Sequence, residues 1–302
     1  MPTMIDELRD LDLRAIFASL RLSADLPREI FARRSTRRLP GAVIEPARVG
    51  EPELPPPGYV LGTYRLERAI GIGGCGAVYR ARHVVLDNVV AIKLMRPSVV
   101  RSRPARIDHP NVVRVIDVAT TGAHTYIVME HVDGPDLSVM LRRKGALPPK
   151  VVVRVLRHVA AALAAGLAER LIRRDVKPSN ILLTRAGITK LADFGLAPTS
   201  AADAAAVIGT ATYGAPEQVS DPQRVDFRSD IYSLGITAYH ALTGRLPPET
   251  PGGTPRDRDR APSQFAVVPV ALDDLVVAAT APRPSDRPAS YESLEAALRA
   301  LR

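Results

Sequence analysis

The sequence feature that most constrains the fold is a change of pattern near Gly134. Between Thr63 and Val132 the chain consists of short runs rich in β-branched residues, separated by residues typical of turns. These runs are TYRLERAIG, AVYRARH, VVAIKLM, VVRVIDVA and TYIVMEHV. Such runs predict an antiparallel sheet. After Gly134 the apolar residues take helical spacing, in PPKVVVRVLRHVAAALAAGLAERL, RSDIYSLGITAYHALTG and the closing SYESLEAALRAL. The sequence therefore predicts an α+β fold with a small sheet-rich part and a larger helical part.

The length of the chain fits this division. Its 302 residues, 46% of them hydrophobic, can bury one large core or two smaller ones. Proline is frequent before residue 59, which is typical of a stiff, extended linker. We therefore expect an N-terminal extension with helical spacing (1–34), a proline-rich linker (35–58) and a main domain (59–302) whose lobes span about 59–132 and 133–302.

The chain is basic, with a formal net charge of +9. A strongly basic chain can indicate a nucleic-acid-binding protein. Here the arginines are scattered among Ala, Pro and Asp, and only 4% of the residues are aromatic, so the sequence predicts a solvated surface and no nucleic-acid partner. Only five of the 41 Lys and Arg residues are lysines. Each lysine is therefore more informative than it would be in an average chain.

Cysteine usage and hydropathy bear on the compartment. The single Cys75 excludes an internal disulfide and a multi-cysteine zinc site. The N-terminus is acidic and lacks the cationic start and apolar run of a signal peptide. Charged residues interrupt the longest apolar stretch, residues 151–172, so it predicts a core helix and no membrane span. We expect a cytoplasmic protein.

A glycine-rich motif, GIGGCGAV, stands early in the sheet-rich part and contains Gly71, Gly73, Gly76 and Val78. Glycines at this spacing let a backbone turn tightly and approach phosphates. A dinucleotide-binding fingerprint has similar glycines but opens a helix, whereas VYRARHVV continues as a strand. The motif therefore predicts a hairpin that covers phosphates, with a purely structural hairpin as the alternative.

Four further motifs follow in order. VAIK ends a strand on Lys93, and RRDVKPSNILL carries Asp175, Lys177 and Asn180. Then come DFG, which begins at Asp193, and APE. A carboxylate, a cation and an amide at the spacing of RRDVKPSNILL can orient a hydroxyl, steady a phosphate and ligate a metal. The carboxylate of DFG, beside a glycine joint, suits Mg²⁺.

Together and in this order, the five motifs resemble those of the protein kinase family, most closely its bacterial Ser/Thr members, over about residues 62–301. The resemblance implies a two-lobed kinase fold, with a small antiparallel-sheet N-lobe and a larger helical C-lobe. It also implies transfer of the γ-phosphate of ATP to Ser or Thr hydroxyls of protein substrates, with Mg²⁺ or Mn²⁺ as cofactor. A lysine two residues after the catalytic aspartate, as at Lys177, is the Ser/Thr-type signature.

The resemblance implies catalytic roles for particular residues. Asp175 would orient the substrate hydroxyl, with Lys177 near the γ-phosphate. Thr210 would contact Asp175 and shape the substrate site, and Asn180 and Asp193 would ligate the metal. Each role depends on the family pattern and not on spacing alone.

The resemblance also implies an ATP-binding set drawn from both lobes. Its members are the phosphate-covering Gly71, Gly73, Gly76 and Val78, the phosphate-binding Lys93, the adenine-enclosing Ala91 and Leu182, the hinge residues Glu130 and Val132, and the ribose-binding Asp136. Outside this set, Glu217 and Arg287 would form a buried ion pair that stabilises the large lobe.

Three features depart from the family pattern. Between Lys93 and the DHPNVV turn, the longest proline-free run lies between Pro97 and Pro104, too short for most of the regulatory helix that carries the lysine's glutamate partner. Arg173 stands where the family has histidine, and we expect this larger charged side chain to disturb the packing of Phe194. The segment PETPGGTPRDRDRAPS predicts an exposed loop in place of a helical docking region.

These departures leave two functions open. The retained metal-binding and catalytic residues favour an active Ser/Thr kinase, slowed by the missing helix. The alternative is a pseudokinase that binds nucleotide and acts as a signalling scaffold. A further hypothesis places residues 4–20 where the regulatory helix would lie. The loop between DFG and APE offers acceptors for self-phosphorylation, namely Thr199, Ser200, Thr210 and Thr212.

Overall fold

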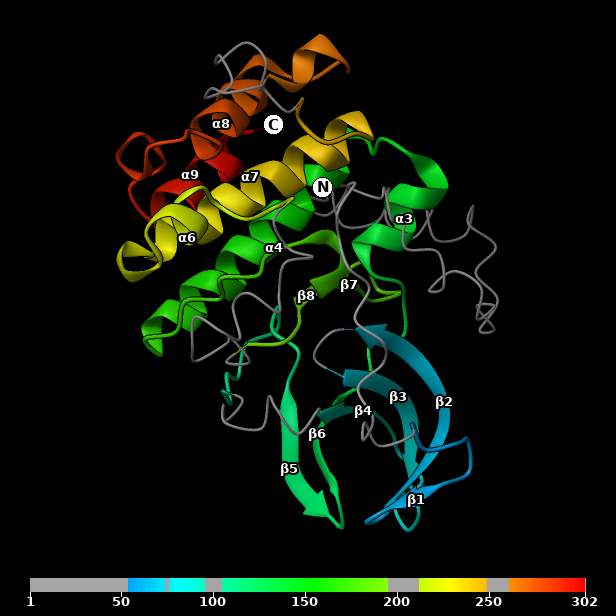
Figure 1. The fold of residues 1–302 in the computed structure, drawn as a ribbon. Helices are drawn as coiled ribbons and strands as arrows, with labels where there is room; N and C mark the ends of the chain where they lie inside the picture. Colours follow the sequence, from blue (N-terminus) through cyan, green and yellow to red (C-terminus); the bar gives the residue numbers. More distant parts are fainter. Residues whose placement is uncertain (1–53, 74–75, 96–104, 195–211, 249–260, 302) are drawn as a thin grey trace, which may run out of the picture. The chain divides into compact units, whose positions relative to one another are not determined.

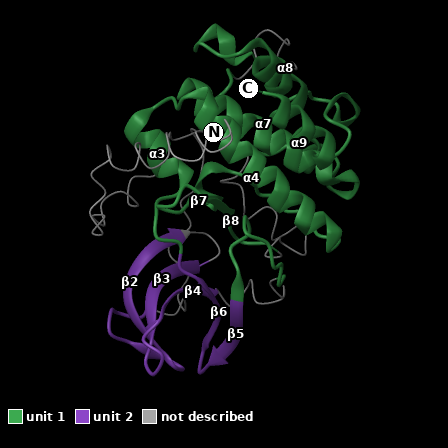
Figure 2. Cartoon of the chain, turned by 180° about the vertical axis from the view of Figure 1, so that it is seen from behind, with its two compact units in different colours: residues 1–20, 101–115, 132–302 green, residues 21–100, 116–131 purple. Residues whose placement is uncertain are grey.

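The computed structural model describes residues 54–73, 76–95, 105–194, 212–248 and 261–301 (Figure 1). These residues form two compact units (Figure 2). Unit 2 takes the described residues up to 95 together with 116–131, and unit 1 takes 105–115 and the described residues from 132 onward. The N-terminal extension, most of the linker, Cys75, the stretch 96–104 and Thr210 lie outside the described residues.

Unit 2 is built on a six-stranded sheet with the strand order β1-β2-β3-β4-β6-β5. Each neighbouring pair from β1 through β4 to β6 is antiparallel. The glycine-rich motif joins β2 to β3, with Gly73 and Gly76 opposite each other, so the predicted hairpin is present. The strands are β1 (Val60–Leu61), β2 (Tyr64–Gly73), β3 (Gly76–His83), β4 (Val89–Met95), β5 (Val115–Thr121) and β6 (His124–Glu130).

The alternation of side chains along β3 explains how the sheet buries one face. Successive side chains of a strand point to opposite faces. Ala77, Tyr79 and Ala81 are buried, whereas the residues between them are only partly buried. The buried set packs with Leu66 and Ile92 in one apolar cluster of unit 2. The sheet thus has its own core.

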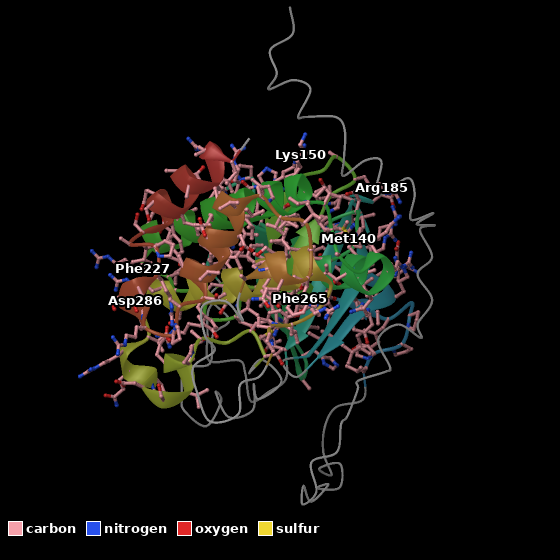
Figure 3. The ribbon with its side chains drawn as sticks, turned by 90° about the horizontal axis from the view of Figure 1, so that it is seen from above. Met140, Lys150, Arg185, Phe227, Phe265 and Asp286 are labelled. Atoms are coloured by element: carbon pink, nitrogen blue, oxygen red, sulfur yellow. The ribbon has the colours of Figure 1, made fainter. Side chains whose placement is uncertain are left out.

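Unit 1 is mainly helical (Figure 1). It holds the larger apolar core. Around this core Met140 on α3 is buried, while Lys150 near the start of α4 is exposed (Figure 3). A small antiparallel hairpin of β7 and β8 lies against α4. The elements are α3 (Leu137–Lys144), α4 (Pro149–Ala168), β7 (Ile181–Leu183), β8 (Thr189–Leu191), α6 (Glu217–Ser220), α7 (Phe227–Thr243), α8 (Val270–Ala279) and α9 (Tyr291–Ala300).

Helix α4 is the central helix of unit 1. Its first residue is Pro149, at a helical position where the missing N–H costs no hydrogen bond. Val151, Val155, Val159 and Leu163 repeat every four residues and are all buried. By length and composition alone α4 could cross a membrane. In the structure it packs against α7, α9 and β8, as the sequence predicted for a core helix.

Helix α7 has clear signals at both ends. The side chain of Asp226 accepts a hydrogen bond from the backbone N–H of Arg228 and caps the N-terminus. Gly244 ends the helix in the left-handed conformation, with φ of 71°. Between these caps most residues of α7 are buried, so the helix lies inside unit 1.

The fold class predicted from the sequence is confirmed: a sheet-rich unit and a larger helical unit are present, and the predicted helices at α4, α7 and α9 form. One segment differs from expectation. Residues 105–115 were predicted with the small lobe, but they pack with unit 1. The backbone N–H of Val113 donates to the carbonyl of Leu191, and the N–H of Leu191 donates to the carbonyl of Asn111.

Candidate active site

The loop between α4 and β7 brings together two predicted catalytic side chains, Asp175 and Lys177, and one predicted metal ligand, Asn180. Nζ of Lys177 lies 2.9 Å from Oδ1 of Asp175. Nδ2 of Asn180 donates to Oδ2 of Asp175 and to its backbone carbonyl, each at 2.9 Å. An ammonium group and an amide thus hold the two carboxylate oxygens of Asp175 from different sides.

The carboxylate of Asp230, on the first turn of α7, anchors the start of this loop. Its oxygens accept hydrogen bonds from the backbone N–H groups of Arg173, at 2.8 Å, and Arg174, at 2.7 Å. Arg174 has φ of 59°, a conformation that is uncommon for residues other than glycine and needs such support. Burial raises the pKa of Asp230 to about 6, and the two backbone hydrogen bonds act in the opposite direction.

The predicted metal ligands lie on adjoining segments. The backbone N–H of Ala192 donates to the carbonyl of Asn180 at 2.9 Å, so the residue before Asp193 is tied to the loop that carries Asn180. Asp193 has φ of 64°, which turns the chain sharply after β8. Phe194 follows and is buried in the core of unit 1. A Cβ atom on Gly166 of α4 would clash with its ring, so Gly166 makes room for Phe194.

These residues fit a hard divalent cation. The NH₂ group of Asn180 faces Asp175, so its amide oxygen is the atom directed away and suited to a metal. Together with the carboxylate of Asp193 it supplies oxygen donors, which Mg²⁺ and Mn²⁺ prefer. Within the described residues no group of three or more His, Cys, Asp or Glu side chains could hold a metal by itself. Protein sites usually bind Mg²⁺ through one or two carboxylates plus substrate phosphates.

In unit 2, the predicted phosphate-binding residues lie on β2, β3 and β4. Lys93 is on β4 and is 7% exposed, with Val78 of β3 and Ile127 of β6 as its neighbours across the strands. Gly76 has φ of 139°, and a Cβ atom there would overlap the carbonyl oxygen of Leu94. Glycine is therefore required at this position by the backbone of unit 2 itself.

Two other predicted ATP-binding residues of unit 1 meet at a β-bridge. Asp136 pairs with Leu182 of β7. The carboxylate of Asp136 also caps α3, because Oδ1 accepts hydrogen bonds from the N–H of Val139 and the hydroxyl of Ser138. Burial raises the pKa of Asp136, while these hydrogen bonds act in the opposite direction. Asp136 thus has a structural role, whatever part it takes in binding ribose.

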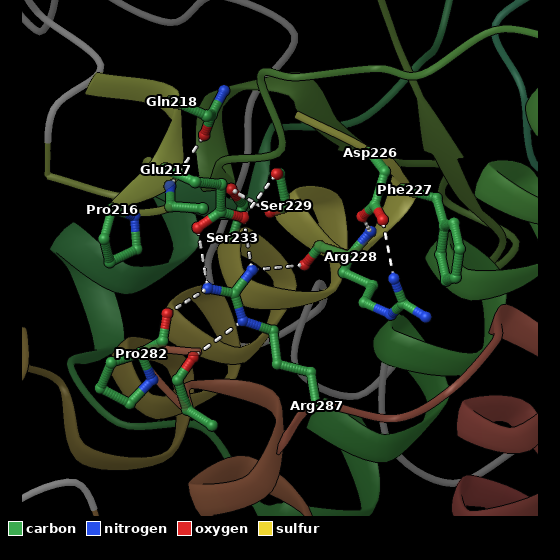
Figure 4. A network of polar contacts seen from close by, with 12 residues as sticks. Pro216, Glu217, Gln218, Asp226, Phe227, Arg228, Ser229, Ser233, Pro282 and Arg287 are labelled. Atoms are coloured by element: carbon green, nitrogen blue, oxygen red, sulfur yellow. Dashed lines mark hydrogen bonds and ion pairs between the residues drawn. The ribbon is translucent and has the colours of Figure 1, made fainter. Parts of the chain in front are cut away.

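The Glu217–Arg287 pair predicted from the resemblance is present (Figure 4). Nη1 and Nη2 of Arg287 donate to the two carboxylate oxygens of Glu217 at 2.6 and 2.9 Å. Ser229 of α7 donates to the same carboxylate at 2.6 Å. The pair joins the APE motif on α6 to the segment that precedes α9.

One contact at the site was not predicted from the sequence. The side chain of Gln218, directly after APE, accepts from the N–H of Ala215 and donates to the carbonyl of Arg174. It therefore links the end of the predicted activation segment to the catalytic loop. Nearby, the hydroxyl of Tyr213 lies 2.7 Å from Nδ1 of His240 on α7. The sequence gives no pattern for either contact, because both join residues from separate elements.

The expectation that Arg173 disturbs Phe194 is wrong for this structure. Phe194 is only 4% exposed. The Nε of Arg173 donates to the carbonyl of Ala192 at 3.0 Å, so the arginine supports the backbone that leads to Phe194. The larger side chain is accommodated because it extends along this peptide.

Comparisons with known proteins agree with this geometry. A family model described as "Protein kinase domain" matches residues 64–294. Serine/threonine-protein kinase PknL of Mycobacterium tuberculosis is 38% identical over 261 residues, which cover 79% of this chain and 65% of PknL. Pkn1 of Myxococcus xanthus, also named a serine/threonine-protein kinase, is 37% identical over 280 residues, 83% of this chain and 40% of Pkn1. PknH of M. tuberculosis is 34% identical over 260 residues, 78% of this chain and 41% of PknH. The chain spans less than two thirds of the length of each of these relatives.

Proposed function

The chain belongs to the protein kinase family, and we propose that it transfers the γ-phosphate of ATP to serine or threonine hydroxyls of protein substrates. The observation that carries this proposal is the arrangement around Asp175. Its carboxylate is held by Lys177 and Asn180 in a fixed orientation, as a base that aligns a hydroxyl must be.

Each residue of the loop has a separate part in the proposed reaction. Asp175 accepts a hydrogen bond from the substrate hydroxyl and orients its oxygen toward the phosphorus. Lys177 lies beside this carboxylate and supplies positive charge where the γ-phosphate is attacked. Asn180 and Asp193 would hold Mg²⁺ or Mn²⁺, which neutralises phosphate charge when it is bound.

The proposal extends to unit 2. Lys93 would hold the α- and β-phosphates, beneath the hairpin of Gly71, Gly73 and Gly76. Lys177 and Lys93 are two of only five lysines in a chain that otherwise uses arginine. A compact ammonium group and a planar guanidinium are not interchangeable at a phosphate, which supports assigning both lysines to ATP.

An active kinase is favoured over the pseudokinase alternative. The three side chains that touch the metal and the hydroxyl in this family, Asp175, Asn180 and Asp193, are all retained, and the loop that carries two of them is well ordered by hydrogen bonds. The named relatives are serine/threonine-protein kinases. We include self-phosphorylation in the proposal, with acceptors in the loop between DFG and APE.

The test incubates the purified chain with Mg²⁺ and γ-labelled ATP, with and without a generic basic protein. We expect label in the protein substrate and in the chain itself. Asp175→Asn should lower the rate by about 100-fold or more, because general-base residues contribute about 10²–10⁴-fold. The matched control is Asp274→Asn, an exposed aspartate on α8. ATP-dependent thermal stabilisation without any label incorporation would establish the pseudokinase instead.

A further inference from the structure

Arg173, the residue that replaces the family's histidine, directs side-chain N–H groups toward two different parts of the site. Its side chain is 3% exposed. Its backbone N–H donates to Asp230, and Nε donates to the carbonyl of Ala192 at 3.0 Å. Ala192 directly precedes Asp193. The guanidinium group therefore fixes the peptide from which a proposed metal ligand projects.

The other end of the same guanidinium group faces the proposed base. Nη2 of Arg173 lies 3.9 Å from Oδ2 of Asp175. This distance is too long for a hydrogen bond. Nη2 is nevertheless fully buried, and among the described residues it has no hydrogen-bond partner. A buried charged donor without a partner is costly, so a small movement that closes this gap is favourable.

The geometry of arginine explains why one side chain reaches both places. A guanidinium group presents five N–H donors in a rigid plane, directed to several sides, and keeps its charge at every relevant pH. A neutral imidazole has one N–H donor. A neutral histidine that donates to Ala192 would therefore have no donor left for Asp175.

We propose that Arg173 is a positioning residue that couples the two halves of the site, holding the peptide of Asp193 through Nε and closing on Asp175 through Nη2 when substrate and nucleotide are bound. This inference rests on the proposed kinase function. The contact with Ala192 fixes the position of Asp193, the proposed metal ligand. The contact with Asp175 fixes the carboxylate that aligns the substrate hydroxyl. The two contacts are separable by substitution.

The test compares Arg173→Met, which removes both contacts, with Arg173→His, which keeps a donor for Ala192 only. Two quantities are measured: turnover with ATP and a generic basic protein, and the affinity for ADP by calorimetry with and without Mg²⁺. Arg299→Lys is the control, because Arg299 is an exposed arginine of α9 that pairs with Glu295. Circular dichroism checks that each variant is folded.

We expect the two variants to differ in how they affect turnover and the Mg²⁺-dependent affinity for ADP. Arg173→Met should lose about tenfold or more of the gain in ADP affinity that Mg²⁺ provides, and about 10- to 100-fold in kcat, because it removes both the hydrogen bond to Ala192 and the proposed contact with Asp175. Arg173→His should keep the Mg²⁺-dependent gain and the KM for ATP, while kcat falls about tenfold. A merely structural role would lower both quantities together in both variants.

The opposite results overturn the inference. One such result is an Arg173→Met variant whose affinity for ADP still rises with Mg²⁺ as in the wild type. The other is an Arg173→His variant with unchanged kcat. If Arg173→Met does not fold, the kcat of Arg173→His decides. If the wild-type chain transfers no phosphate, the proposed function fails while ADP binding still decides about the contact with Ala192. The two failures are therefore distinguishable.

Discussion

Replacing Arg287 by alanine should remove a side chain that makes five hydrogen bonds in unit 1. The guanidinium group is fully buried and uses all five of its N–H donors (Figure 4). Two donors bind the carboxylate of Glu217. The other three bind the backbone carbonyls of Ala281, Arg228 and Pro282, at 2.8, 3.0 and 3.0 Å. Arg287→Ala leaves a buried carboxylate and these three carbonyls without the donors they have in the wild type.

The expected loss of stability in Arg287→Ala follows from the burial of the ion pair. Removing one partner of a buried ion pair costs about 3–5 kcal/mol, because the remaining charge stays buried and uncompensated. Ser229 still donates to Glu217 in the variant, which places the expected loss nearer 3 than 5 kcal/mol. A domain is stable by about 5–15 kcal/mol in total, so the loss is a large fraction.

The assay is urea denaturation followed by circular dichroism, with Arg299→Ala as the control. The free energy of unfolding should fall by about 3–5 kcal/mol, and it usually depends on urea with a slope of about 1–3 kcal/mol/M. The urea concentration at the midpoint of unfolding should therefore fall by about 2 M. The control breaks an exposed ion pair four residues apart on α9 and should cost about 0.3–0.5 kcal/mol. If Arg287→Ala costs less than about 1 kcal/mol, the argument from buried charge is refuted.

The same pair makes a pH prediction. Burial would raise the pKa of Glu217, but hydrogen bonds from Arg287 and Ser229 outweigh it and hold the pKa below its usual value of 4.5. A carboxyl group with a lowered pKa in the folded state stabilises the fold above its unfolded pKa and loses that contribution as the pH falls through the folded value. The stability gap between the wild type and Arg287→Ala should therefore narrow below about pH 4.5. A gap that stays constant down to pH 3 would contradict the pairing.

Two further changes test unit 2 and the core of unit 1. Gly76→Ala should destabilise the sheet by about 2–3 kcal/mol in thermal melts, because its φ of 139° and the Leu94 carbonyl exclude a side chain. Gly122→Ala, at φ of 57° with open space around it, should cost only about 1 kcal/mol, and equal losses would refute the steric reason. Burial, aided by Arg154 and Arg157, lowers the pKa of His158 from 6.5 to about 4, so wild-type stability should fall as pH decreases through this window. His158→Gln should flatten that dependence, and an unchanged slope would show that another group titrates.

The elements that could be predicted are those whose own residues determine them. Helix α4 repeats buried apolar residues every four positions, and β3 alternates buried and partly buried ones, so each carries its pattern in a single window. The motifs at Gly76, Asp175 and Asp193 could also be predicted from their own residues. Gly76 is needed for its backbone conformation, and Asp175 and Asp193 are needed for their carboxylates. Local sequence and final structure agree at these places.

The elements that were missed depend on partners far away in the chain. Strands β7 and β8 have three residues each, too few for a periodicity. They pair with each other, and the N–H of Leu191 on β8 donates to the carbonyl of Asn111. Helix α3 did have a readable signal: Asp136 as N-cap and Gly145 just after the last turn. The error at Arg173 has another cause, since size and charge alone do not reveal that Nε reaches the Ala192 carbonyl.

The catalytic loop depends on the C-terminal part of the described chain. Asp230, which holds Arg173 and Arg174, also accepts a hydrogen bond from the hydroxyl of Tyr291 at 3.2 Å. Tyr291 begins α9, and Arg287 lies four residues before it. Both are buried, and through Asp230 and Glu217 they support the start of the catalytic loop and the start of α6. Loss of α9 would therefore remove a hydrogen-bond donor to Asp230 and loosen the backbone N–H contacts that keep Arg174 at its left-handed φ. Because Arg174 directly precedes Asp175, we expect damage to α9 to lower kcat before it abolishes folding.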